Sequence, residues 1–248
     1  MLRALARLSY ASTLGVLAGL LALVVVVSGI APHDRADWLL ENALVAGFLA
    51  AAALGHRRLR LSRLSWLFIF LFLCLHELGA HYTYSEVPYD DWADTLFGVS
   101  ISEVLGLERN HFDRVVHFAY GLLLAYPIRE IFLRVGDARG FWGYFLPLDL
   151  TMSTSMLYEL IEWAAAEVFG GDLGVAYLGT QGDPWDAQKD MALASLGALV
   201  AMALTAAINR RLDRDFAREW RESLRVKHPQ PLGEEAIVRL ADAEEGRA

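Results

Sequence analysis

The sequence is poor in charge and in cysteine. Of its 248 residues, 21% are charged and 55% are hydrophobic. A water-soluble domain of this size normally carries more charge and fewer unbroken apolar runs, so the composition indicates a membrane protein. The one cysteine, Cys74, lies within an apolar run and has no second cysteine for an intrachain disulfide. We expect it to pack as a small buried hydrophobic residue.

Positive charge is also scarce. The chain has 22 Lys and Arg residues against 30 Asp and Glu residues, a net charge of -8 at pH 7. Binding to nucleic acid relies on concentrated Lys and Arg, so this balance excludes a nucleic-acid partner. The chain also lacks a convincing internal repeat, so the inverted-repeat plan of many transporters is not supported.

Long apolar runs, in contrast, are plentiful. Residues 8–30 exceed the roughly 20 residues that a helix needs to cross a bilayer. This run is longer than the apolar part of a signal peptide and no A-x-A cleavage site follows it, so we expect an uncleaved first helix. The sequence predicts an all-α bundle of six transmembrane helices within residues 1–210. The expected spans are 8–30, 38–55, 64–82, 111–133, 141–168 and 187–208.

Arginine is concentrated at alternate connections between these spans. It occurs before the first span, between the second and third, around the turn between the fourth and fifth, and after the sixth. Cytoplasmic flanks are enriched in positive charge, so we expect both termini in the cytoplasm. The basic residues that fall on or beside the other connections are Arg35, Arg109, Arg114 and Lys189.

The connections carry further signals. The acidic outer connection 83–110 predicts two short interfacial helices, opened at Asp91 and at Ser100. The first would bring apolar side chains to the lipid headgroups, namely those of Trp92, Leu96 and Phe97. The glycine-rich outer connection 170–186 predicts an ordered turn.

The segment 211–248 follows the sixth span. Leu212, Phe216, Trp220 and Leu224 recur every four residues among arginines. This pattern fits a basic amphipathic helix on the inner leaflet and equally fits a plain extension of the sixth helix. From His228 onward the apolar period is weak, so we expect a mobile tail.

Ionisable side chains inside the spans mark a candidate site. Each costs roughly 2.5–3.5 kcal/mol at the bilayer centre, so such groups normally face the bundle interior and serve a function. Because the spans alternate in direction, those of the third to sixth spans all fall in the outer half of the bilayer, where we expect one site. They are His76, Glu77, His81, Asp113, Arg114, His117, Glu159, Glu162, Asp186, Lys189 and Asp190. Near the cytoplasmic side we expect only Glu41, Asn42 and Asp149.

The motif HELGAH, residues 76–81, argues against a zinc protease. Its histidines are five residues apart, about 140° around a helix, so they do not share a face. A zinc protease needs the i, i+4 histidines of H-E-x-x-H. A metal held by ligands from separate helices remains an alternative.

The charge balance of the site leaves three solutions open. The site brings six carboxyl groups against Arg114 and Lys189, an excess that needs protonated histidines, neutral carboxyl groups, or a divalent cation or cationic substrate. Histidine with carboxylate suits zinc, manganese or iron better than calcium. The candidate metal ligands are His76, His81, His117, Glu162 and Asp186.

Three functions remain open. The first is metal-dependent hydrolysis or group transfer on a cell-envelope or lipid-linked substrate, with a carboxylate as base on water, a histidine as acid or ligand, and Arg114 steadying an anionic group. The candidate catalytic residues are Glu77, Asp113, Arg114, His117, Glu159, Glu162 and Asp190. The second is a proton- or cation-coupled small transporter. The third is a non-catalytic structural or regulatory membrane protein, whose polar groups only lock the bundle.

Four blocks of sequence resemble a known family. HELGAHYTYSEVP, NHFDRVVHFAYGLLLAYPIRE, LYELIEW and GTQGDPWDAQKDM together resemble the YjdF-like inner-membrane proteins of bacteria, over about residues 10–210. The resemblance implies a polytopic inner-membrane protein and no particular activity. FDRVVHFAYGLLL and WDAQKDMALASLGAL are also similar to VanZ-like membrane proteins, which are associated with glycopeptide resistance and the cell envelope. That similarity falls on Asp113, His117, Glu159 or Glu162, Asp186, Asp190 and Gly197.

Overall fold

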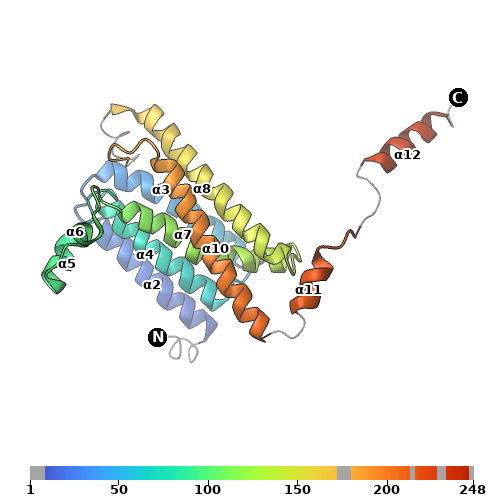
Figure 1. Cartoon of the computed structure of the whole chain (residues 1–248), viewed down its shortest axis with the longest axis horizontal. Helices are drawn as coiled ribbons and strands as arrows, with labels where there is room; N and C mark the ends of the chain where they lie inside the picture. Colours follow the sequence, from blue (N-terminus) through green and yellow to red (C-terminus); the bar gives the residue numbers. More distant parts are fainter. Residues whose placement is uncertain (1–8, 172–179, 213–215, 228–232, 246–248) are drawn as a thin grey trace.

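The computed structural model describes residues 9–171, 180–212, 216–227 and 233–245. In these ranges every regular element is a helix and none is a strand, as the sequence predicted. Six long helices make up the bundle (Figure 1). They are α2 (Tyr10–Ser28), α3 (Arg35–Gly55), α4 (Arg63–His81), α7 (Phe112–Val135), α8 (Trp142–Phe169) and α10 (Asp186–Leu212).

Five of these helices are long and apolar enough to cross a membrane: α2, α3, α4, α7 and α10. The sixth, α8, has 28 residues, but its apolar surface is interrupted by acidic side chains, and it does not meet the same measure of hydropathy. The structure therefore contains all six predicted helices, and five of them qualify as spans by length and composition.

Local sequence signals fix where several helices begin. The Ser9 hydroxyl accepts a hydrogen bond from the Ser12 N–H at the start of α2, and Ser62 does the same for Ser65 at the start of α4. At the start of α3, the Asp34 carboxylate accepts from two backbone N–H groups. Such caps satisfy amide groups that have no partner inside the helix.

The helices α7 and α10 form the closest pair in the bundle. A Cβ atom on Gly121 of α7 would lie 1.9 Å from the carbonyl oxygen of Ala194, and one on Gly197 of α10 would lie 2.1 Å from that of Phe118. Only glycine fits at both positions, so the two backbones touch. The contact of Gly121 with Ala194 lies one helical turn from His117 and from Asp190, so a change in helix separation here would move these two side chains relative to each other.

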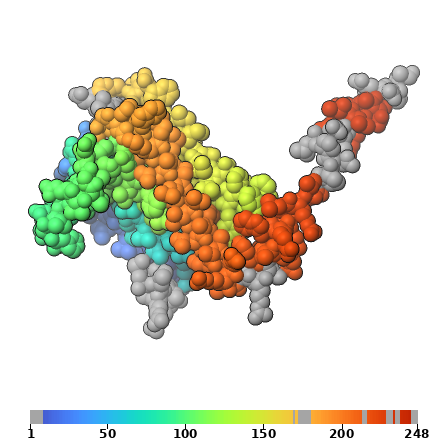
Figure 2. Space-filling view, in the orientation of Figure 1, coloured from blue at the N-terminus to red at the C-terminus, as the bar shows by residue number. Residues whose placement is uncertain are grey.

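The outer connection forms two short helices, as expected. They are α5 (Tyr89–Phe97) and α6 (Ile101–Leu105), and Ser100 caps the second by accepting from the Glu103 N–H. Both project from one end of the bundle (Figure 2). Their exposed surface includes large apolar side chains, namely those of Trp92, Leu96, Phe97, Val104 and Leu105.

A separate short helix, α11 (Phe216–Ser223), lies at the opposite end of the bundle from α5 and α6 (Figure 1). Phe216 and Trp220 pack against Tyr144 of α8, and the Ser223 hydroxyl accepts a hydrogen bond of 2.9 Å from the Phe141 N–H. The stripe of apolar residues predicted for this segment thus contacts the bundle through its two aromatic members.

The structure differs from the prediction for the C-terminal tail and describes the connection 170–186 only in part. Helix α12 (Glu234–Glu245) forms within the segment that was predicted to be a mobile tail, so that prediction was wrong for these residues. The predicted ordered turn over 170–186 lies partly outside the described residues, because residues 172–179 are not among them.

Candidate functional site

A cavity of about 220 Å³ lies between α3, α4, α7 and α8. Its walls combine ionisable and phenolic side chains with aliphatic ones. The ionisable and phenolic residues that line it are Asp37, Glu41, His76, Tyr84, Asp113, His117, Tyr120, Tyr158 and Glu162. The cavity thus brings together predicted site residues of α4, α7 and α8, and it adds residues of α3 that were not predicted there.

His117 is the centre of the carboxylate cluster. Its Nε2 atom lies 3.4 Å from Oδ1 of Asp113, one turn earlier on α7, and 3.6 Å from Oε1 of Glu159 on α8. Asp190 completes the group from α10. One ligand atom each of Asp113, His117 and Asp190 lie within 4.8 Å of one another, a grouping that could hold a metal ion.

The polar groups of this cluster are incompletely paired. Asp190 is 2% exposed, and its Oδ1 atom has no hydrogen-bond partner in the part of the chain that the structure describes. The same holds for Oδ1 of Asp37 in the cavity wall. A buried carboxylate oxygen without a partner is costly, so it points to a ligand or a proton at this place.

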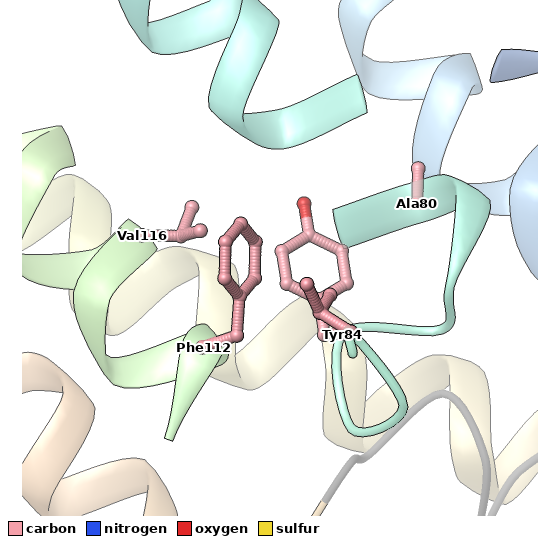
Figure 3. Packing of buried hydrophobic residues seen from close by; sticks show 5 residues of the cluster. Ala80, Tyr84, Phe112 and Val116 are labelled. Atoms are coloured by element: carbon pink, nitrogen blue, oxygen red, sulfur yellow. The ribbon is translucent and has the colours of Figure 1, made fainter. Parts of the chain in front are cut away.

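His76 faces the cavity and is held by Tyr84. The Tyr84 hydroxyl and Nδ1 of His76 share a hydrogen bond of 2.5 Å. The Tyr84 ring belongs to a buried cluster with Ala80, Phe112 and Val116 (Figure 3). A Cβ atom on Gly79 would lie 2.5 Å from this ring, so the glycine of HELGAH leaves the space that the tyrosine fills.

Glu77 and His81 lie on another face of α4, next to the end of α2. The Ser28 hydroxyl donates to Glu77, and Nδ1 of His81 donates to the Ser28 carbonyl oxygen at 2.7 Å. His76 and His81 therefore lie on different faces of α4, as their spacing of five residues predicted. Glu77 and His81 are not among the residues that line the cavity.

Arg114 and Asp186 belong to an ion-pair network outside the cavity. Nη2 of Arg114 lies 2.5 Å from Oδ2 of Asp183, and Nη1 of Arg109 lies 2.5 Å from Oδ1 of Asp186. Lys189 contacts the same Asp183 oxygen at 2.5 Å. The network joins the start of α7 to the turn before α10.

This network changes the acidity of Asp183. The hydrogen bond from Lys189, aided by the Trp185 N–H and by Arg114, lowers the pKa of Asp183 from 3.8 to about 2. Asp183 therefore stays ionised and keeps the basic side chains of Arg114 and Lys189 engaged. Arg114 and Lys189 therefore pair with Asp183 and do not neutralise the carboxylates around His117.

Glu41 was predicted near the cytoplasmic side, away from the other site residues, and this prediction was wrong. Glu41 lies in the second turn of α3, lines the cavity with His76 and Glu162, and accepts a hydrogen bond of 3.0 Å from the Tyr158 hydroxyl. Because α3 begins at Arg35, its first two turns lie at the same end of the bundle as the last turns of α4. The direction of the helix was the signal that could have placed both Asp37 and Glu41 in the site.

The fold and the site define a multi-pass helical membrane protein with a carboxylate- and histidine-lined cavity. Residues 13–211 match the model of the family described as "Predicted membrane protein (DUF2238)", and the chain belongs to this family. It is similar to the inner membrane protein YjdF of Escherichia coli (strain K12), with 38% identity over 200 residues that cover 79% of this chain and 90% of that protein. No solved structure matches the chain.

These comparisons establish the YjdF-like relationship that the four sequence blocks indicated, and they assign the protein to the inner membrane. The VanZ-like resemblance stays a prediction.

Proposed function

We propose that this inner-membrane protein binds a divalent cation between Asp113, His117 and Asp190 and uses it for hydrolysis or group transfer on an envelope or lipid-linked substrate. The observation that carries the proposal is the grouping of three ligand atoms from two helices within 4.8 Å. A tetrahedral ion with bonds of about 2.1 Å places its ligand atoms about 3.4 Å apart. The His117–Asp113 distance of 3.4 Å already has this value.

The charge balance supports a cation. Asp113, Glu159 and Asp190 surround one imidazole, while Arg114 and Lys189 pair with Asp183. A bound divalent ion would compensate the carboxylates and satisfy the open oxygen of Asp190. Histidine with carboxylates favours zinc, manganese or iron.

The neighbouring groups suit catalysis on water. Glu162 lines both the cavity and a second hollow between α8 and the turn before α10, which places its carboxyl group where water and substrate would meet. A carboxylate there would accept a proton from attacking water, and His76, held by Tyr84, would supply a proton to the leaving group.

Elemental analysis of the detergent-purified protein tests the cation. We expect about one equivalent of metal in the wild type and little in His117→Gln and Asp190→Asn. The matched controls are His81→Gln and Asp186→Asn, which alter the same residue types outside the cluster and should keep the metal. Size-exclusion profiles check that each variant is folded. A wild-type protein that binds no zinc, manganese or iron, even after incubation with each, would overturn the proposal.

A proton- or cation-coupled small transporter is the second candidate. It is favoured by polar side chains of α8 that continue inward from Glu162 and Tyr158 to the buried Ser155 and Thr151. Flux of protons or cations in liposomes would distinguish it from an enzyme. A purely structural role is less favoured. If the polar groups served only to hold the helices together, Oδ1 of Asp190 would have a hydrogen-bond partner, and it has none among the described residues.

We also propose that α8 is the sixth span and that both termini lie in the cytoplasm. Glu159 and Glu162 line hollows of the bundle, so these two of the four acidic residues of α8 need not contact lipid. In a Cys74→Ser background, a cysteine at Glu86 should react with a membrane-impermeant maleimide in intact spheroplasts. A cysteine at Asp137 should react only after the membrane is opened, and the reverse pattern would refute this orientation.

A further inference from the structure

The cavity is amphipathic along the bundle axis. Toward the outer end its walls carry Asp37 and Glu41, whereas one to two turns deeper α3 presents Leu44, Val45 and Phe48. The opposite wall repeats this order, because Ile69 and Leu73 lie deeper than His76 on α4. From Glu41 to Phe48 the helix rises about 10 Å, so the apolar part is deep enough for a segment of hydrocarbon chain.

The cavity opens between α3 and α8. Helix α3 packs on α4, and α8 packs on α7 and α10, while α3 and α8 make almost no direct backbone contact. The hydrogen bond from Tyr158 to Glu41 crosses this gap. Leu44 and Phe48 line the cavity, yet they are 40% and 42% exposed, which marks them as the rim of the opening.

The opening faces lipid rather than water. On α3, Leu44 and Phe48 follow the polar first turns toward the middle of the helix, and the exposed neighbours on α8 are Met152, Met156 and Leu157. In a multi-pass membrane protein, an apolar surface at this depth contacts acyl chains. A ligand that enters here therefore arrives from the bilayer.

We infer that the cavity admits one acyl chain of a membrane lipid through the gap between α3 and α8, with an amine-bearing headgroup among the outer carboxylates. Charge complementarity selects the headgroup, since Asp37 and Glu41 line the outer part and none of the described residues that line this cavity is Lys or Arg. An ammonium group would pair with these carboxylates, and the Tyr158–Glu41 bond would have to open to admit the chain. The inference rests on the proposed function in that it names the substrate class of the same site.

Photo-crosslinking in nanodiscs tests this entry. Two lipids with a diazirine in the acyl chain serve as probes, one with an ethanolamine headgroup and one with a glycerol headgroup. Ile69 and Leu73 are each 4% exposed, so lipid outside the bundle does not reach them. We expect the ethanolamine probe to label Ile69 and Leu73, and to label them about tenfold more than the glycerol probe, a preference of about 1.4 kcal/mol.

Variants at the rim provide the control. Leu44→Trp narrows the opening and should lower labelling of Ile69 and Leu73 about tenfold. Leu23→Trp adds the same ring on α2, where Leu23 is 59% exposed and does not line this cavity. No labelling of Ile69 and Leu73 in the wild type, equal labelling by both probes, or equal labelling in the two variants would each overturn the inference. The outcome is separable from the cation proposal, because His117→Gln should lose metal and keep the label.

Discussion

Replacing Gly121 with alanine should push α7 away from α10 and open the carboxylate cluster. The new Cβ atom would lie 1.9 Å from the carbonyl oxygen of Ala194, whereas ordinary contact begins at 3.4 Å. The helices must therefore separate locally by about 1.5 Å, a change of the size that overpacking imposes at a cost of about 1–3 kcal/mol. His117 and Asp190 lie one turn from this contact, so their ligand atoms would move apart by a comparable distance.

The assay combines thermal unfolding in detergent with metal content. For a protein of this size, we expect Gly121→Ala to lower Tm by roughly 2–10 °C and to weaken metal retention. Gly19→Ala on α2 is the matched control, since a Cβ atom there meets no atom within 4 Å. Its Tm should stay the same or rise slightly, because alanine is the better helix former. If the two variants have the same Tm and metal content, the close contact between α7 and α10 does not position the cluster.

Two further predictions concern polar contacts outside the cluster. Asp183→Asn should lower Tm at pH 6, and the difference from wild type should disappear as the pH falls from about 4 to about 2. The sign follows because the pKa of Asp183 is lowered to about 2 in the folded protein, so its contribution is present above the ordinary value of 3.8 and lost below; a constant difference over this range would contradict the assignment. Glu130→Gln should destabilise the protein by about 1.5–3 kcal/mol, because the Glu130 carboxylate accepts hydrogen bonds from the Ser62 N–H and the Ser65 hydroxyl at the start of α4. Chemical denaturation beside the exposed variant Glu103→Gln would measure this, and equal midpoints would exclude the role.

The sequence was sufficient for the helices and for much of the site. Uninterrupted apolar runs are a strong signal of helices that cross a bilayer, and strict alternation of their direction brings polar residues of distant segments to the same depth. This reasoning correctly grouped Asp113, His117, Glu159 and Glu162 around one cavity wall or its margin.

The other contacts of the site could not be predicted, because they depend on which helices are neighbours. Nothing in the sequence shows that Glu77 and His81 face Ser28, or that Asp186 pairs with Arg109, because helix rotation and partner choice follow from packing. The close contact at Gly121 was equally hidden, since a glycine in an apolar helix is common and gains meaning only from the backbone opposite it.

Ser28 has a consequence for how the chain is assembled in the membrane. Its hydroxyl accepts from the Trp38 indole N–H and donates to Glu77, whose side chain is fully buried. A carboxyl group inserted on α4 alone would face hydrocarbon without a hydrogen-bond donor. The first three long helices thus share one polar junction, and we expect them to leave the insertion machinery as a group, with α2 and α3 waiting for α4.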